Sequence, residues 1–323
     1  MQALIDFDRA PVFAIPATAD SGAAVVREGM LLEGPQGWGE FSPAVDANPA
    51  VLGRWLTAAV EGGTVGWPDP VRGRVPVAVR VPAVDAVRAH RAVIDSGCAA
   101  ADVVVGFGPL ADDIARVAAV RDAVGPTGGV RCDAGGRWNV DDAVTAIEAL
   151  DRAAGGLQYI EQPCGTTEEL AAVRRRVDVP VAVDESLRNA ADPSGLELAG
   201  VADVAVLSFG PMGGARRALR IAEACGLPCV VTSTGETSIG LAGAVALAGV
   251  LPELPYACGL GSRGLFAGDV VPQGRWLIPV DGHLPVAPMP PGPDPGLVER
   301  FALADPDRVT WWRQRLSAAQ TRA

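Results

Sequence analysis

The sequence lacks one residue type entirely. It has 323 residues and contains no lysine, so all 27 residues counted as lysine or arginine are arginines. An arginine guanidinium stays protonated in proteins, so arginine cannot replace a lysine that acts as a general base. The codon usage of a GC-rich genome accounts for missing surface lysines, but it would not readily remove a catalytic one. The positions where lysines are expected therefore matter most.

Features of membrane and secreted proteins are also missing. No run of about 18 uninterrupted apolar residues occurs, and the N-terminal segment carries Asp6 and Asp8 in place of an apolar signal-type core. The cysteines form no close Cys-x-x-Cys pair, which favours reduced thiols and a cytoplasmic location. A formal net charge of −11 argues against nucleic acid and anionic membranes as partners. We expect a cytoplasmic monomer or small homo-oligomer that binds a small-molecule substrate.

The sequence pattern divides the chain into three parts. Residues 1–76 contain short strand-like runs such as Ala23 to Arg27 and Met30 to Glu33, joined by glycine-rich turns, and predict a small α+β domain. Residues 77–264 repeat a short β-branched run, a turn and an alanine-rich helical stretch. Residues 265–323 form a tail with a proline-rich segment, which we expect to pack on the N-terminal domain.

The central part predicts a barrel. Strand and helix alternate about every 25 to 30 residues, which is typical of a parallel sheet, and about eight such units favour a closed (β/α) barrel. The predicted strands are Ala78–Val81, Asp102–Val105, Val130–Asp133, Gln158–Glu161, Val181–Asp184, Val204–Leu207, Pro228–Ser233 and Leu254–Cys258. Active sites of such barrels lie at the carboxyl ends of the strands, so polar residues that end strands are the candidates for function.

Three successive predicted strands end in carboxylates. These are Asp133, Glu161 and Asp184, separated by 28 and then 23 residues, or one strand–helix unit each. The three side chains can therefore converge at the mouth of the barrel. Crowded carboxylates repel one another unless a cation neutralises them, and hard oxygen ligands suit Mg²⁺. A single acid at a strand end is more often a helix cap, but three in consecutive units favour a metal site.

Several ordered motifs carry a family resemblance. They are Gly37-Trp38-Gly39-Glu40, Asp133-Ala134-Gly135-Gly136, Glu161-Gln162-Pro163, Asp184-Glu185-Ser186 and Gly213-Gly214. With these motifs the chain resembles the enolase superfamily and, within it, o-succinylbenzoate synthases of the actinobacterial type, which are dehydratases of the menaquinone pathway. The resemblance implies an N-terminal α+β capping domain and a modified (β/α) barrel of the TIM type. It also implies that Asp133, Glu161 and Asp184 hold Mg²⁺, which stabilises an enediolate next to the substrate carboxylate.

The departures from that family fall on its proton-transfer residues. The family carries Lys-x-Lys on its second barrel strand, where this chain has Asp102 and Val104. The family lysine that ends the sixth strand is replaced by Ser208. The family motif Asp-Ala-Asn has become Asp133-Ala134-Gly135, which removes an amide beside the expected metal. The expected metal ligands are kept, whereas the lysines that move protons are absent.

Few residues are available to replace the lysine base. Valine at 104 cannot accept a proton, and an unactivated serine at 208 is too weakly basic. Asp102 is a candidate base, with a surface or salt-bridged acid as the alternative. Glu236, which follows the seventh strand, is the better candidate by position, although a structural role at a helix N-terminus is the alternative there. We therefore name Glu236, Asp102 and Ser208 as the candidate catalytic residues.

These replacements predict a changed function. General acid–base catalysis is worth roughly 10² to 10⁴ in rate, so the standard o-succinylbenzoate synthase reaction should be very slow or absent. The mouth of the barrel becomes more apolar and more negative, which suits a less anionic substrate. One hypothesis is a divergent lyase or isomerase that acts with Mg²⁺ on a small carboxylate or related cyclic substrate. The alternatives are a repurposed cyclase of secondary metabolism and a non-catalytic ligand-binding protein.

Overall fold

The N-terminal part folds as an antiparallel sheet with one long helix. The computed structural model describes residues 5–21 and 26–322, so residues 23–25 of the first expected strand lie outside the described residues. The sheet has the order β1 (Val12–Pro16), β2 (Val26–Gly34) and β3 (Gly37–Phe41), and it is followed by η2 (Pro49–Val51) and α1 (Leu52–Thr64). A short 3₁₀ turn, η1 (Ala19–Ser21), separates the first two strands.

A glycine explains how α1 comes so close to the sheet. A Cβ at Gly39 on β3 would lie 1.9 Å from the carbonyl oxygen of Ala59 on α1. Gly34 has the same relationship to Gly63, with 2.1 Å to its carbonyl oxygen. Only residues without a side chain permit these approaches. Gly39 of the Gly37-Trp38-Gly39 motif and Gly34 therefore serve helix–sheet packing.

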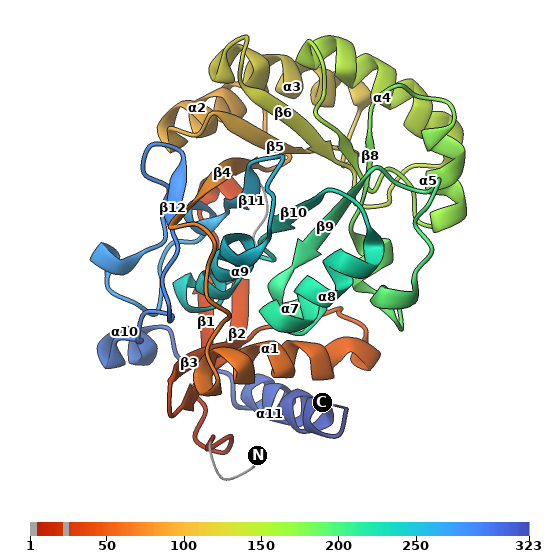
Figure 1. The fold of residues 1–323 in the computed structure, drawn as a ribbon. Helices are drawn as coiled ribbons and strands as arrows, with labels where there is room; N and C mark the ends of the chain where they lie inside the picture. Colours follow the sequence, from red (N-terminus) through yellow and green to blue (C-terminus); the bar gives the residue numbers. More distant parts are fainter. Residues whose placement is uncertain (1–4, 22–25, 323) are drawn as a thin grey trace.

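A closed parallel barrel forms the centre of the molecule (Figure 1). In the described part of the chain its eight strands follow one another in sequence order, and the last pairs with the first. The strands are β4 (Arg74–Val81), β5 (Ala100–Val104), β6 (Gly129–Asp133), β7 (Ile160–Glu161), β8 (Val181–Val183), β9 (Val204–Ser208), β10 (Cys229–Thr232) and β11 (Cys258–Gly261). The predicted fold, a β/α barrel with an N-terminal α+β part, is confirmed.

Helices cover the outside of the barrel. They are α2 (Ala86–Ser96), α3 (Leu110–Val124), α4 (Val140–Ala154), α5 (Thr167–Arg174), α8 (Ala215–Cys225) and α9 (Ser238–Val250). The short helices α6 (Glu185–Arg188) and α7 (Phe209–Met212) follow the carboxyl ends of β8 and β9, and the 3₁₀ turns η3 (Pro193–Gly195), η4 (Arg263–Leu265) and η5 (Gln273–Arg275) lie in later loops. Side chains of Asp85, Asn139 and Thr166 cap the N-termini of α2, α4 and α5. Such caps satisfy backbone N–H groups that have no partner inside the helix. None of the helices in residues 5–21 and 26–322 combines the length and the apolar character needed to cross a membrane.

The last barrel strand lies later in the chain than expected. It was predicted at Leu254–Cys258, but β11 spans Cys258–Gly261. Pro255 lies within the predicted range and has no backbone N–H to donate to a neighbouring strand. The chain pairs with its neighbours only after this proline, and β11 consists of Cys258, Gly259, Leu260 and Gly261.

The C-terminal segment contacts both the barrel and the N-terminal part. Strand β12 (His283–Pro285) pairs antiparallel with β4, and α10 (Pro295–Arg300) precedes α11 (Pro306–Gln320), which packs against α1 (Figure 1). On α11, Trp312 is fully buried, lies edge-on to Phe41 at a centroid distance of 6.2 Å, and donates a hydrogen bond to Glu28. The domain boundaries expected after residues 76 and 264 stay predictions.

Two glutamates of the N-terminal part cap helices of the barrel. Glu61 on α1 accepts a hydrogen bond of 2.6 Å from the backbone N–H of Ala215, the first residue of α8. Glu40 on β3 accepts hydrogen bonds of 3.1 Å from the N–H groups of Thr237 and Gly240 at the start of α9. A carboxylate at a helix N-terminus is favoured by the helix dipole. Because α8 and α9 begin near the carboxyl ends of β9 and β10, these caps hold the N-terminal part over the barrel mouth.

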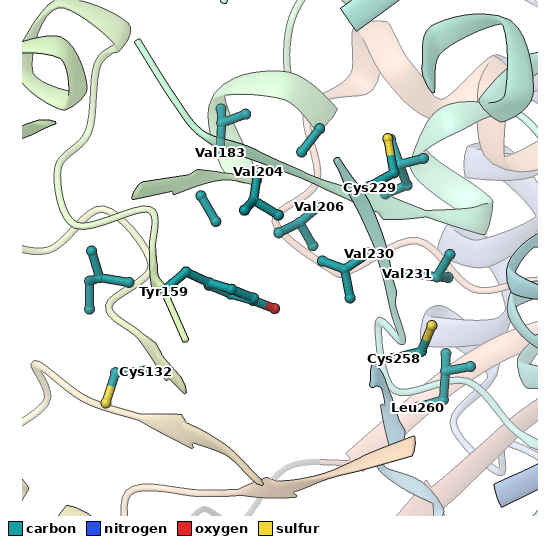
Figure 2. Packing of buried hydrophobic residues seen from close by; sticks show 14 of the residues in the cluster. Cys132, Tyr159, Val183, Val204, Val206, Cys229, Val230, Val231, Cys258 and Leu260 are labelled. Carbon is teal, nitrogen blue, oxygen red and sulfur yellow. The ribbon is translucent and has the colours of Figure 1, made fainter. Parts of the chain in front are cut away.

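Side chains fill the interior of the barrel. Figure 2 shows Tyr159 pointing across the interior toward Val206 and Val230, and all three belong to one continuous buried cluster. Arg131 on β6 lies over the ring of Tyr159, with its guanidinium carbon 5.2 Å from the ring centroid. The interior therefore holds a buried cation below the mouth, in addition to apolar side chains.

Candidate active site

The three strand-end carboxylates lie next to one another at the barrel mouth. Asp133 ends β6, Glu161 ends β7 and the two residues are paired in register, while Asp184 directly follows β8. Their residues are only 8%, 3% and 3% exposed. Burial raises the pKa of Glu161 well above its ordinary value, and the charges of Asp133, Asp102 and Asp184 raise it further. The arrangement brings together the carboxylates that the sequence pattern predicted to converge.

An arginine that the sequence reasoning missed lies among them. Arg80 on β4 places Nη1 2.8 Å from Oδ2 of Asp102 and Nη2 2.5 Å from Oδ2 of Asp133. Burial alone would lower the pKa of Arg80, but the carboxylates of Asp102, Asp133 and Glu161 hold it well above its ordinary value. A signal was present in the sequence. Arg80 interrupts a valine-rich strand, and residues two apart along a strand share a face.

Strand register explains why Arg80 meets Asp102. Arg80 pairs with Asp102 across β4 and β5, and Asp102 pairs with Arg131 across β5 and β6. Residues paired in register point to the same face of a sheet, so these three charges form one layer inside the barrel. Asp133 lies two residues beyond Arg131 on β6, in the next layer toward the mouth. The two terminal nitrogens of Arg80 contact Asp102 in one layer and Asp133 in the next.

A second arginine, Arg188, contacts the carboxylates of Asp184 and Glu185. Arg188 on α6 lies 3.5 Å from Oδ2 of Asp184 and also bonds to the carboxylate of Glu185. Burial raises the pKa of Asp184 to about 7, with Arg188 opposing this and Glu185 and Asp133 adding to it. Among the described residues, Oδ1 of Asp184 is buried and has no hydrogen-bond partner. Sequence reasoning did not single out Arg188 either.

Glu161 is the carboxylate left without an arginine of its own. In the part of the chain that the structure describes, no group donates a hydrogen bond to its side chain. Arg80 and Arg188 nevertheless interact electrostatically with its carboxylate. Five carboxyls, at 102, 133, 161, 184 and 185, interact with three guanidiniums, at 80, 131 and 188. The cluster therefore has an excess of negative charge when every group is ionised.

Gln162 fixes the relative positions of Glu161 and Asp184. Its Oε1 accepts hydrogen bonds from the N–H groups of Asp184 at 3.0 Å and Ser186 at 3.1 Å, and its Nε2 donates to the carbonyl oxygen of Cys164 at 2.8 Å. Gln162 is fully buried and has a φ of 40°, a conformation that non-glycine residues rarely adopt. These bonds tie the end of β7 to the end of β8.

The donor chemistry of the cluster suits a hard divalent cation. Among the described residues, Oδ1 of Asp184 has no hydrogen-bond partner and no group donates to the side chain of Glu161, and the cluster has an excess of negative charge when every group is ionised. One oxygen of Asp133, however, is already bound by Arg80. As the side chains lie, no group of three His, Cys, Asp or Glu residues within the described ranges is arranged to hold a metal ion. The residues fit the ion in chemistry and charge, and Arg80 shares one of the three expected ligands.

Of the three positions where lysines are expected, Asp102 and Ser208 are buried and Val104 is half-buried. Asp102 is 1% exposed and ion-paired with Arg80, and its Oδ1 has no partner among the described residues. Val104 is in register with Asp133 and so lies at the cluster. Ser208 ends β9, is fully buried, and its Oγ likewise has no partner in the described part of the chain. The catalytic roles of Asp102 and Ser208 stay predictions.

Glu236 lies in the loop between β10 and α9. Its carboxylate accepts hydrogen bonds from Oγ of Ser233 at 2.6 Å and from the N–H of Thr234 at 3.0 Å. It lies with Arg27 and Arg263 around a narrow gap between the N-terminal sheet and the barrel, which has no room for a water molecule. Glu236 is therefore a well-anchored acid at the mouth of the barrel, and its catalytic role stays a prediction.

Comparison with known proteins identifies the family. Residues 12–63 match the enolase N-terminal domain-like family, and residues 85–297 match the enolase C-terminal domain-like family. The chain belongs to the enolase superfamily. These two matches correspond to the N-terminal sheet with α1 and to most of the barrel.

Enolase-superfamily relatives resemble the chain over nearly its whole length. It is 50% identical to an o-succinylbenzoate synthase from Thermobifida fusca, with 95% of each chain covered, and 45% identical to one from Mycolicibacterium smegmatis, with 96% of this chain and 95% of the relative covered. Muconate lactonizing enzyme from Pseudomonas putida has the same fold, with a TM-score of 0.75 at 21% identity over 93% of this chain and 99% of that enzyme.

Proposed function

We propose that this enolase-superfamily protein is an o-succinylbenzoate-synthase-like lyase or isomerase with little or no standard o-succinylbenzoate synthase activity. Its relatives at 50% and 45% identity carry that name, which supports a substrate of related chemistry: a small carboxylate or a related cyclic compound. The observation that carries the proposal is the absence of lysine, because Asp102, Val104 and Ser208 occupy the positions where the resemblance expects it.

Asp133, Glu161 and Asp184 would hold Mg²⁺, the ion that enolase-superfamily members typically bind. When bound, the ion would supply positive charge that stabilises an enediolate beside the substrate carboxylate. Gln162 would keep two of the ligands in place through its bonds between β7 and β8. The surplus negative charge of the cluster supports this assignment.

The chain's own groups offer poor replacements for a lysine base. Val104 has no titratable atom, and Ser208 has no adjacent group among the described residues to accept its proton. The carboxylate of Asp102 is bound by Arg80, so taking up a proton would weaken a charge-assisted hydrogen bond. Proton removal from carbon should therefore lose most of the roughly 10² to 10⁴ that a positioned base contributes.

Two arginines lie beside Glu236. Within the described residues, Nε of Arg27 and Nη2 of Arg263 are buried and have no hydrogen-bond partner. Buried N–H donors without partners are costly unless a ligand satisfies them. The gap between them has no room for a water-sized group as the side chains lie, so a substrate carboxylate would reach these donors only if the N-terminal sheet moved away from the barrel.

A deuterium-exchange experiment tests the proposal. The protein is incubated in D₂O with Mg²⁺ and a panel of small carboxylic acids that includes the usual o-succinylbenzoate precursor, and NMR follows deuteration next to the carboxylate and product formation. We expect turnover of the precursor to be at least about 10²-fold slower than with the Thermobifida fusca relative, and faster turnover of another acid in the panel. A precursor rate equal to that of the relative would contradict the proposal.

A second candidate is a cyclase of secondary metabolism, and a third is a non-catalytic ligand-binding protein. Both are favoured by the lack of an available base at positions 102, 104 and 208. A cyclase would form product without deuteration at the carbon next to the carboxylate, and Asp133, Glu161 and Asp184 could all be replaced by alanine without loss of its activity. A binding protein would turn over no member of the panel, yet its unfolding temperature would rise with its ligand.

A further inference from the structure

Arg80 occupies the centre of the charge network at the barrel mouth. Both of its terminal nitrogens contact carboxylates, one from the layer of Asp102 and one from the layer of Asp133. A forked guanidinium holds two acceptors with a fixed geometry, which a single ammonium group does not. The side chain of Arg80 is about one-quarter exposed, whereas those of Asp102 and Asp133 are nearly buried, so water screens these contacts little.

The other two arginines cannot take its place. Arg131 lies in the layer below, where it stacks on Tyr159 and donates to the carbonyl oxygen of Ala257 at 2.5 Å. Arg188 is engaged by Asp184 and Glu185 on the opposite side of the cluster. Arg80 is thus the cation bound directly to Asp133, the expected metal ligand on β6.

We propose that Arg80 is a resident cation of the carboxylate cluster and competes with a divalent metal ion for Asp133. This inference rests on the proposed metal site at Asp133, Glu161 and Asp184. The guanidinium is permanently charged and tethered to β4, so it neutralises part of the cluster at any metal concentration. A metal ion that uses both oxygens of Asp133 must displace Nη2, and it must also remain close to a second positive charge.

Metal binding should therefore be weak in the native chain. Two unit charges about 4 Å apart near a protein surface interact by enough to change an affinity at least about tenfold. Removing the guanidinium should leave Asp102 and Asp133 without their partner and make the cluster more negative. The protein should then depend on the metal ion for part of its stability, because a ligand that binds only the folded state stabilises it.

Titration with Mg²⁺ tests the inference without any enzyme assay. The native chain, Arg80→Gln and Arg80→Lys are compared by isothermal calorimetry and by thermal unfolding in EDTA and in increasing MgCl₂. Arg74→Gln is the matched control, because Arg74 lies on the same strand but is exposed, and within the described residues its side chain donates only to the carbonyl oxygen of Val280. We expect Arg80→Gln to unfold at a lower temperature than native in EDTA, to regain the difference with Mg²⁺, and to bind Mg²⁺ at least about tenfold more tightly. Arg80→Lys should fall between the two.

Equal Mg²⁺ affinities for native and Arg80→Gln would overturn the inference while leaving the proposed metal site intact. Failure of both proteins to bind Mg²⁺ would overturn the inference and the proposed metal site together. If Arg80→Gln does not fold in either buffer, the Mg²⁺ affinity of Arg80→Lys is compared with that of the native chain instead. This variant keeps the positive charge but loses one of the two carboxylate contacts of the guanidinium. An unchanged affinity in that variant would also overturn the inference. Because this titration does not involve the precursor reaction, its outcome is independent of the test of the proposed function.

Discussion

The guanidinium of Arg80 and the carboxylate of Asp133 are in direct contact, with 2.5 Å between Nη2 and Oδ2. This contact joins the first barrel strand to the third through the mouth of the barrel. A chain without lysine therefore still has a cation beside its expected metal ligands, but it comes from β4 and not from the positions 102, 104 and 208 where the resemblance expects lysines. A permanently charged arginine can hold carboxylates in place, and it cannot remove a proton.

Glu161→Gln should make the metal-free protein more stable. The native carboxyl is buried, and its pKa is raised well above the ordinary value by burial and by the charges of Asp133, Asp102 and Asp184. Among the described residues, no arginine is bound to it directly. A raised pKa in the folded state means that the folded state disfavours the ionised carboxylate. The free energy of unfolding therefore decreases as pH rises above the pKa that the carboxyl has in the unfolded chain. At pH 7 in EDTA we expect a higher free energy of unfolding for Glu161→Gln than for the native chain, measured in urea.

The same substitution should weaken Mg²⁺ binding, because an amide replaces a charged ligand. Glu168→Gln is the control, since Glu168 lies nearby on α5 and is exposed. A destabilised Glu161→Gln in EDTA would show that another group neutralises Glu161 in the native protein.

Glu61→Ala should loosen the attachment of the N-terminal part to the barrel. The carboxylate of Glu61 caps α8 and also bonds to Nη1 of Arg216 at 2.8 Å. Loss of a helix cap and of a partner for a buried N–H costs about 1 to 3 kcal/mol. The urea midpoint of Glu61→Ala should fall accordingly, whereas that of Glu33→Ala, an exposed glutamate on β2, should change little. Equal midpoints for the two variants would refute the role of this cap.

Glu40 should make stability depend on pH. Burial raises its pKa to about 7, although Arg27 and hydrogen bonds from Ser42 and Thr237 oppose the rise. A raised folded-state pKa gives stability that is fully present below the ordinary value of 4.5 and is lost as pH rises through about 7. The contribution has an upper limit of about 3 kcal/mol. We expect the unfolding temperature of native protein to fall between pH 4.5 and 7 by more than that of Glu40→Gln, and parallel pH curves for the two proteins would contradict this.

The sequence was sufficient to predict the barrel and the convergence of Asp133, Glu161 and Asp184. Both depend on spacing along the chain: each strand–helix unit returns to the same end of the sheet, so acids that end consecutive strands must be neighbours. The contact of Arg80 with Asp133 does not follow from spacing, because it depends on how far a long side chain reaches across two strands. Alternation along β4 and β5 could have placed Arg80 and Asp102 on one face, but not the second contact.

Some local features also required three-dimensional information. The last barrel strand begins only at Cys258, after Pro255, because strand pairing with β4 and β10 determines where β11 lies. The sequence also does not reveal the hydrogen bonds of Gln162, since they join its side-chain oxygen to backbone N–H groups more than 20 residues away in sequence. The motif Glu161-Gln162-Pro163 indicates a family resemblance, whereas the structure shows that Gln162 links the end of β7 to the end of β8.

The most direct test of the account is an assay of the native chain and of Val104→Lys plus Ser208→Lys with the usual o-succinylbenzoate precursor and Mg²⁺, beside the Thermobifida fusca relative. If the missing lysines determine the change in function, the native rate should be at least about 10²-fold below that of the relative, and the double substitution should raise it. A native rate near that of the relative would contradict the account, because this chain would then perform the reaction without a lysine.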